Sequence, residues 1–390
     1  MRITSITIQN FKGIKHTKIE LIPTGANIYT LIGLNESGKT TILEAISTFN
    51  INKDETGALY GVNIDDVKPT SYVPKGLKSN FTGEITVQVE IEFDTLDKQK
   101  LAEWVKKKTK WKLINSSIPN KVNITRGYKF ENSDFKSKIY TIGGFNVKAT
   151  LIGNTKIETI PSTHLVWDKG TDFIVDRFPE ILYFPTFIFN QPEKIVLNPT
   201  TDEKPINRLY REILGNVASS LDRPLDIHKH IVDRILGTPS GSEKVLSFFM
   251  LPADKQQQIE ASLNEISAHI TQTVFGSWTK IFGGDFSERE IVLKLGVQNN
   301  NDQQEVYIQF AIKDRKSTYD IAERSLGFRW FFSFLLFTFY RKSNAGKSTL
   351  FLLDEPASNL HARAQMQLLD NLSKIAINGN QILSQPIATI

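Results

Sequence analysis

The sequence predicts an α/β fold in which a mixed β-sheet lobe is joined to a helical lobe. Three observations carry this prediction. A complete G-x-x-x-x-G-K-[ST] motif at 33–41 lies between an apolar, strand-like run and a helical pattern. A second apolar strand, at 350–353, ends in two adjacent acids. Between them, 205–282 carries helical periodicity, with apolar residues such as Ile206 and Leu209 on one face.

The other elements follow from local patterns along the chain. Ile3, Ile6 and Ile8 alternate with other residues before a turn, which predicts two strands in the first twenty residues. Near-perfect alternation at 85–93 predicts a half-buried antiparallel strand. We expect further strands within 120–170 and at 181–189, 290–295, 306–310 and 380–383, a buried helix at 328–339 and a helix at 361–376.

The glycine-rich motif has the composition of a phosphate-binding loop. Gly33 and Gly38 allow the backbone to curl so that successive N–H groups point at phosphate oxygens. Lys39 places a positive charge near the β- and γ-phosphates, and the Thr40 hydroxyl can bind Mg²⁺. The pattern predicts a site for ATP and Mg²⁺, the alternative being a chance glycine-rich turn. The motif comprises Gly33, Leu34, Asn35, Glu36, Ser37, Gly38, Lys39, Thr40 and Thr41.

The two acids after the 350–353 strand supply what such a loop needs. Four consecutive apolar residues are typical of a buried parallel strand. Asp354 at its end is placed to hold Mg²⁺ through its waters, and Glu355 can polarise the attacking water as a general base. A surface turn after a strand is the alternative, but the presence of the phosphate loop favours the nucleotide site.

Composition excludes several kinds of site and of location. The chain contains no cysteine, so a disulfide, a thiolate zinc site and a cysteine nucleophile are excluded. Met1–Ser5 alternates like a strand and lacks the apolar core of a signal peptide. Trp330–Phe339 is strongly apolar but short, because a bilayer span takes about 20 residues. We therefore expect a cytoplasmic protein with no membrane partner.

The densest basic cluster, at 104–112, is a candidate contact for DNA or RNA. The formal net charge of the chain is +5, and in this cluster lysines alternate with Trp104 and Trp111. Such residues can follow a phosphate backbone and stack on bases. The alternative, which we weigh more heavily, is a solvated helix face whose tryptophans pack inward.

Three further strings resemble one family of ATPases. Asp354–His361 looks like the Walker B motif and D-loop of ABC-type ATPases. Arg324–Trp330 resembles their signature motif in the S-x-G-F form found in the OLD-family and RecF-like branch. Ile8–Ile14 resembles the N-terminal signature of the RecF, SMC and OLD group. Over essentially its whole length, the chain is thus similar to an ABC-type ATPase head of a group that serves DNA metabolism and anti-phage defence.

The resemblance implies a homodimer in which two heads pair head to tail. Ser325 and the amide of Gly327 would then contact the γ-phosphate held by the second copy. A helix beginning at these residues would present free N–H groups to that anion. The alternative is a plain serine N-cap on a core helix.

The resemblance also implies a domain organisation. We expect a single head over 1–390, with a nucleotide-binding α/β lobe formed by 1–200 and 286–390 and a helical insertion at 201–285. Gln191 is the candidate for the Q-loop residue of the family.

The end of the chain departs from the family pattern. ABC-type ATPases carry a γ-phosphate-sensing histidine at the end of the strand that follows Walker B. Here 380–383 begins such a strand, but Ser384–Ile390 contains no histidine, and His361 is the last one in the chain. Three hypotheses follow: the chain is truncated or altered near its end, hydrolysis proceeds without that residue, or the chain is an ATP-dependent clamp or scaffold with little hydrolysis.

The leading functional hypothesis is an ATPase that dimerises on ATP and regulates an effector, a nuclease or toxin, in contact with DNA or RNA. The nucleotide-binding subunit of a membrane transporter is a second hypothesis. A long mixed insertion between Lys39 and Ser325 and the lack of a membrane-docking segment argue against it. A small-molecule kinase is a third, and the signature and D-loop resemblances argue against that one.

Overall fold

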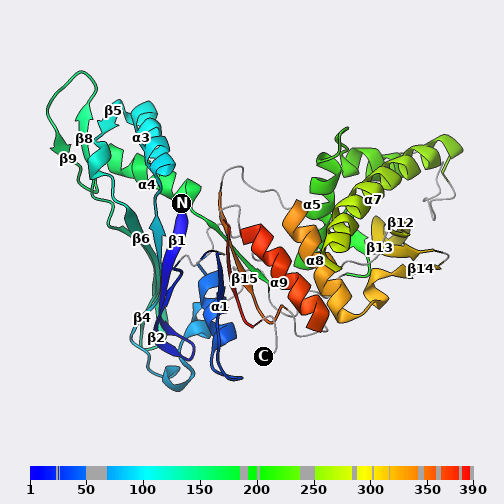
Figure 1. The fold of residues 1–390 in the computed structure, drawn as a ribbon, viewed down its shortest axis with the longest axis horizontal. Coiled ribbons are helices and arrows are strands. Elements are labelled where there is room, and N and C mark those ends of the chain that lie inside the picture. Colours follow the sequence, from blue (N-terminus) through cyan, green and yellow to red (C-terminus); the bar gives the residue numbers. More distant parts are fainter. Residues whose placement is uncertain are drawn as a thin grey trace.

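Three layers of structure follow one another along the molecule. An antiparallel sheet lies at one end, a parallel sheet in the middle, and helices with a second antiparallel sheet at the other end (Figure 1). The mixed α/β fold that the sequence predicts is therefore present. The computed structural model describes residues 1–22, 25, 27–49, 68–184, 192–199, 203–237, 251–282, 288–300, 303–315, 317–340, 347–356, 362–376 and 380–386.

The first antiparallel sheet has five strands in the order β2-β1-β4-β6-β7. The alternation predicted for 85–93 is confirmed, since Ile85, Val87, Val89 and Ile91 of β4 are buried and their neighbours are not. The hairpin predicted for the first twenty residues is β1–β2. The strands are β1 (Arg2–Phe11), β2 (Ile14–Glu20), β4 (Gly83–Glu92), β6 (Lys121–Glu131) and β7 (Asp134–Gly143).

Two helices and a small three-stranded sheet cap one end of this sheet (Figure 1). The first helix begins at a capping box, in which Asp94 and Asp97 each accept a hydrogen bond from the other's backbone N–H. The elements are α3 (Thr95–Thr109), α4 (Leu165–Arg177), β5 (Trp111–Leu113), β8 (Lys148–Leu151) and β9 (Glu158–Thr159).

The sequence reading of 120–170 as strands was wrong at its end, where α4 begins at Leu165. Gly170 lies inside this helix, and glycine disfavours helices. Packing requires it, because a Cβ at that position would lie 2.5 Å from the ring of Phe145. The His164 imidazole caps the helix by accepting a hydrogen bond from the Val166 N–H at 3.1 Å.

The central sheet is parallel and has the strand order β10-β15-β16-β3. The predicted buried strand before Asp354 is β15, which pairs with β10 on one side and β16 on the other. Helix α1 packs against β1 and β10, between the two sheets, and α9 covers the opposite face (Figure 1). The elements are β3 (Ile28–Thr30), α1 (Lys39–Ser47), β10 (Glu180–Phe184), β15 (Thr349–Leu353), α9 (Ala362–Ala376) and β16 (Gln381–Ser384).

Side chains of the central strands alternate between two hydrophobic cores. Leu353 and Phe351 of β15 join a core formed with the helical lobe, which we call the helix-side core. Leu350 and Leu352 join a core formed with α1, α3, α4 and the first sheet, which we call the strand-side core. A sheet buried on both faces explains the continuous apolar run that the sequence shows there.

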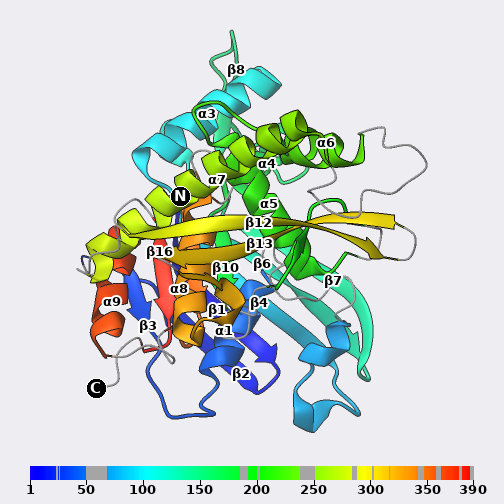
Figure 2. The ribbon, with the colours of Figure 1, turned by 90° about the vertical axis from the view of Figure 1, so that its right-hand side faces the viewer.

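The far end of the molecule combines long helices with an antiparallel ribbon. Helix α7 runs along the β12–β13 pair, which Figure 2 shows from this side. The predicted buried helix is α8. The elements are β11 (Ile195–Val196), α5 (Pro205–Ser219), a π-helix (His228–Val232), α6 (Asp233–Leu236), α7 (Ala253–Phe282), β12 (Arg289–Asn300), β13 (Gln303–Asp314), β14 (Ser317–Asp320) and α8 (Leu326–Tyr340).

The helices predicted within 201–285 are present as α5, α6 and α7. They do not form a core of their own, because Tyr210, Leu214 and Ile270 share the helix-side core with the central strands. The division of the chain into two lobes stays a prediction. None of the helices in the described part of the chain combines the length and the hydrophobicity that a membrane span requires.

Candidate functional site

The carboxyl ends of the four parallel strands lie at one edge of the central sheet. There the chain leaves β3 for the phosphate loop, β15 for Asp354 and β16 for Gln385. Backbone hydrogen bonds hold these exits together: Asp354 N–H donates to the Phe184 carbonyl at 3.0 Å, and Gln385 N–H donates to the Leu353 carbonyl at 3.1 Å. Binding sites of parallel α/β sheets occur at this edge.

The phosphate loop turns sharply into α1, which begins at Lys39. Gly38 has φ +92°, a left-handed conformation that glycine adopts without strain. A Cβ at Gly33 would lie 2.7 Å from the Ser37 hydroxyl oxygen, so the Ser37 side chain would have to shift. Gly38, as the N-cap, has no side chain to accept from the first N–H groups of α1, so these remain available to an anion.

The Lys39 ammonium folds back over this loop. It donates to the carbonyl oxygens of Gly33 at 2.8 Å and Leu34 at 2.7 Å. A phosphate held by the loop amides would compete with these two neutral acceptors, and charge-assisted hydrogen bonds are the stronger ones. The contact of Lys39 with the β- and γ-phosphates stays a prediction.

Asp354 meets Thr40 across the sheet edge, 314 positions apart in the chain. The Thr40 hydroxyl donates to Oδ1 of Asp354 at 3.0 Å, and the Tyr183 hydroxyl donates to Oδ2 at 3.0 Å. Burial raises the pKa of the Asp354 carboxyl above its ordinary range, and the charge of Glu355 acts in the same direction. The hydrogen bonds from Tyr183 and Thr40 act in the opposite direction and lower that pKa.

These oxygens fit a magnesium ion. Mg²⁺ prefers oxygen ligands and is commonly held by one or two protein oxygens together with phosphates. A hydroxyl and a buried carboxylate at hydrogen-bond distance supply that donor set. Thr40 and Asp354 are therefore the residues that would hold the ion.

Glu355 follows Asp354 but faces outward. Its side chain is exposed and its backbone has φ +48°, a left-handed conformation that is unusual for a residue with a side chain. Such strain is common at functional sites. Glu355 is exposed whereas Asp354 is buried, so the two acids have different environments.

Ser325 and Gly327 lie elsewhere, at the start of α8. In Figure 1, β15 and α9 lie between α1 and α8. The Ser325 hydroxyl is exposed and accepts from the Phe328 N–H at 3.4 Å, so the serine N-cap of the alternative reading is present. Contact with a γ-phosphate held by another copy stays a prediction, since the described contacts of Ser325 lie within its own helix.

Two residues at the site were missed by the sequence reading. Tyr183, inside β10, binds Asp354, and its pattern is that of an ordinary core residue. Gln385, at the end of β16, donates through Nε2 to the Thr40 hydroxyl at 3.0 Å and to Oδ1 of Asp354. Gln385 lies at the end of the strand that carries a histidine in ABC-type ATPases, and this position is the sequence signal that could have identified it. Gln191 and the D-loop at 357–361 lie outside the described residues.

The basic cluster at 104–112 uses its tryptophans for packing. The Trp104 indole N–H donates to the Lys169 carbonyl at 3.2 Å, and the ring of Trp111 packs edge-on against His164, with centroids 5.1 Å apart. Both rings are half-buried and pack against the strand-side core, as the inward-packing alternative expects, and base stacking on them stays untested. Lys106, Lys107 and Lys108 are exposed, so a phosphate contact stays a prediction.

Comparison with solved structures finds similar chains at low identity. The Smc head bound to the C-terminal winged-helix domain of ScpA has a TM-score of 0.42 and 14% identity, over 99% of this chain and 89% of that chain. An Smc head domain with an extended coiled coil, bound to the C-terminal domain of ScpA derived from Pyrococcus furiosus, has a TM-score of 0.45 and 14% identity over 99% and 89%. RecF with ATP has a TM-score of 0.42 and 14% identity over 100% and 92%.

Sequence comparison gives one curated relative and one family. An uncharacterized protein of Methanocaldococcus jannaschii is 29% identical over 153 residues, which make up 36% of this chain and 42% of the relative. The match therefore spans less than half of that relative's length. The family model AAA_15, described as an AAA ATPase domain, matches residues 1–389. The chain belongs to this family of ATPases, which fits the RecF- and SMC-related group indicated by its motifs.

Proposed function

We propose that this chain binds ATP with Mg²⁺ at the edge of the central sheet, hydrolyses it, and uses the cycle to assemble with a second copy and control an effector. One observation carries the nucleotide site. Two motifs far apart in the sequence meet there, with the Thr40 hydroxyl 3.0 Å from Oδ1 of Asp354. Phosphate-loop and Walker B residues need this proximity to share one magnesium ion.

Each residue has a separate role at this site. The loop amides and the N-terminus of α1 hold the phosphates, and Lys39 adds its charge. Thr40 and Asp354 would hold Mg²⁺, which when bound neutralises charge on the phosphates. Glu355, exposed beside them, accepts a proton from the attacking water. The water oxygen bonds to the γ-phosphorus while the bond from that phosphorus to the bridging oxygen breaks, releasing ADP and phosphate.

The assembly half of the proposal rests on the resemblance of the signature motif. Ser325 is exposed and directly precedes α8, and Figure 1 shows β15 and α9 between α8 and α1, as a contact made to another copy requires. In the RecF-, SMC- and OLD-like setting, the regulated effector is a nuclease or toxin and the process is DNA metabolism or anti-phage defence. The cytoplasm is the expected location, and contact with DNA or RNA through the lysines of 106–108 is part of the same proposal.

Loss of the Lys39 ammonium tests the ATP site. Lys39→Ala should weaken ATP binding about a hundredfold in calorimetry with Mg²⁺, because it removes a charge-assisted contact to the phosphates. Lys100→Ala is the matched control, since Lys100 is an exposed lysine on α3, one of the helices that cap the end of the five-stranded antiparallel sheet. Undiminished ATP affinity in the Lys39 variant would overturn the site.

A clamp with little hydrolysis is the second candidate, because a glutamine stands at the end of β16 and an amide cannot exchange protons as a histidine does. Glu355→Gln separates the two candidates. The variant should bind ATP like the parent and release phosphate at least about a hundredfold more slowly, the usual contribution of a general base. If the parent releases phosphate no faster than the variant, the clamp is the correct function.

A further inference from the structure

The Gln385 carboxamide lies at the point where the magnesium ligands meet. Its Nε2 donates to the Thr40 hydroxyl oxygen at 3.0 Å and to Oδ1 of Asp354. The Thr40 hydroxyl donates to that same Oδ1 at 3.0 Å. Three side chains from α1, β15 and β16 therefore form a closed ring of hydrogen bonds.

The chemistry of the ring identifies which end of the amide faces inward. A carboxylate only accepts hydrogen bonds, so the end of the amide beside Asp354 must be its NH₂ group. Its nitrogen donates to both the Thr40 hydroxyl oxygen and Oδ1 of Asp354. The positive end of the amide dipole thus points at the two oxygens that fit Mg²⁺.

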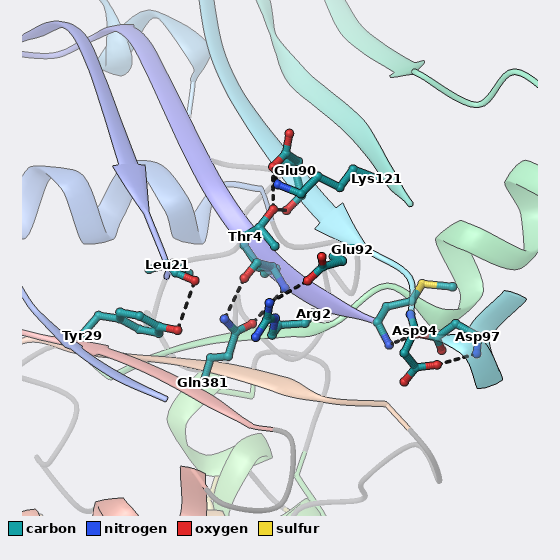
Figure 3. Close-up of polar contacts among 12 residues, drawn as sticks. Arg2, Thr4, Leu21, Tyr29, Glu90, Glu92, Asp94, Asp97, Lys121 and Gln381 are labelled. Carbon is teal, nitrogen blue, oxygen red and sulfur yellow. Dashed lines mark hydrogen bonds and ion pairs between the residues drawn. The ribbon is translucent and has the colours of Figure 1, made fainter. Parts of the chain in front are cut away.

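The backbone of Gln385 is anchored, so this contact is built into the fold. Its N–H donates to the Leu353 carbonyl at 3.1 Å, and only 4% of the residue is exposed. The preceding Ser384 carbonyl accepts from the Leu31 N–H at 2.8 Å, which ties the end of β16 to the start of the phosphate-loop segment. At the other end of β16, the Gln381 amide pairs with the backbone of Ile3 at 2.9 and 2.7 Å (Figure 3).

We propose that the Gln385 amide is a stand-in for the cation. It occupies the Thr40 and Asp354 oxygens until Mg²⁺ arrives, and it must withdraw its NH₂ group before those oxygens can bind the ion. Gln385 is thus a positioning residue that lowers the apparent Mg²⁺ affinity and links cation arrival to the end of β16. This inference rests on the proposed nucleotide site and goes beyond it.

The proposal predicts a change in cation affinity whose direction is opposite to the one that a purely structural role would produce. Breaking the ring removes hydrogen bonds that stabilise the protein without the ion, so the thermal midpoint in EDTA should fall. The same change removes a competitor of Mg²⁺, so the cation should bind more tightly. A glutamine that serves only to hold the strands together would weaken the site when removed, because Thr40 and Asp354 would lose their arrangement.

The experiment measures cation affinity with and without nucleotide. Binding of ATP is followed by calorimetry across a Mg²⁺ titration, and Mn²⁺ binding without nucleotide is followed by electron paramagnetic resonance. Gln385→Ala should lower the Mg²⁺ concentration at half-saturation about tenfold, which corresponds to about 1.4 kcal/mol. The Mn²⁺ dissociation constant should fall by a similar factor. Gln256→Ala is the control, because Gln256 makes a comparable bond, to the Leu251 carbonyl at 2.7 Å, in the helical lobe.

A second variant covers the case in which Gln385→Ala does not fold. Gln385→Asn keeps an amide but shortens it by one methylene, so it should no longer reach both oxygens and should tighten cation binding too. Half-saturation equal to or above that of the parent in the folded variants would overturn the stand-in. A parent protein that binds no ATP at any Mg²⁺ concentration would instead overturn the proposed function, and the Mn²⁺ measurement would still test Gln385.

Discussion

At the scale of single residues, Asp354 shows how one carboxyl is kept both buried and useful. It is 5% exposed, yet it accepts hydrogen bonds from Tyr183, Thr40 and Gln385. These donors offset part of the cost of burying its charge, and the remaining cost leaves its pKa raised. A bound cation would remove that cost, so the unfavourable charge is matched to the ligand the site is built for.

The raised pKa of Asp354 gives a pH-dependent prediction. The folded protein holds this proton more tightly than the unfolded chain, so the carboxyl's contribution to stability is full at low pH and is lost as the pH rises through the raised pKa. Without Mg²⁺, Asp354→Asn should therefore gain stability relative to the parent as the pH rises through that window. Denaturation curves from pH 4 to 8 measure the difference.

The exposed Asp370, on α9, supplies the control, since Asp370→Asn makes the same chemical change outside the site. With Mg²⁺ and ATP present, the parent should be more stable than Asp354→Asn, because a neutral amide cannot balance the charge of the cation as the carboxylate does. A difference between Asp354→Asn and the parent that does not change with pH would contradict the assigned cause.

At the scale of elements, the sequence predicts the helices, strands and loops whose conformation depends on their own residues. The phosphate loop was predictable because Gly38 takes a left-handed backbone conformation that favours glycine, and the strand before Asp354 because burial on both faces requires an unbroken apolar run. Helix α4 was not, since its Gly170 is explained only by Phe145, a residue far away in the sequence. The roles of Tyr183 and Gln385 depend likewise on strand order, which single-strand patterns do not contain.

The pairing of β4 with β6 depends on a glycine in the same way. A Cβ on Gly127 would overlap the Ile85 carbonyl oxygen and approach Cα of Thr86 to 3.0 Å. Because these are backbone atoms, the strands would have to separate. Gly127→Ala should therefore destabilise the protein by about 1–3 kcal/mol, the range of overpacked sites, as measured by urea denaturation.

Gly143, on the neighbouring β7, is the matched control. A Cβ there would meet nothing within 4 Å, so Gly143→Ala should change the free energy of unfolding by less than about 0.5 kcal/mol. Equal effects of the two substitutions would show that the contact across β4 and β6 is not the cause.

At the scale of the whole molecule, the central sheet joins the two cores through alternate residues. Leu182 of β10 belongs to the helix-side core, and Tyr183, the next residue, belongs to the strand-side core and reaches Asp354. The phosphate loop and α1 lie on the strand side, whereas the signature segment at the start of α8 lies on the helix side. One chain therefore presents its nucleotide site and its exposed signature segment on different parts of its surface.

This separation predicts that a substitution in the signature segment should prevent assembly of two copies without changing ATP affinity. In a Glu355→Gln background, which retains ATP, light scattering after size exclusion with ATP and Mg²⁺ should show a mass of twice 44.2 kDa. Adding Ser325→Arg should return the mass to one copy while ATP affinity stays unchanged, because a large cation at this exposed serine would block contact with a second copy but not the loop of its own chain. The control is Ser137→Arg, at an exposed serine of β7. A double mass that survives Ser325→Arg, or a Glu355→Gln protein that stays single with ATP, would contradict assembly through this segment.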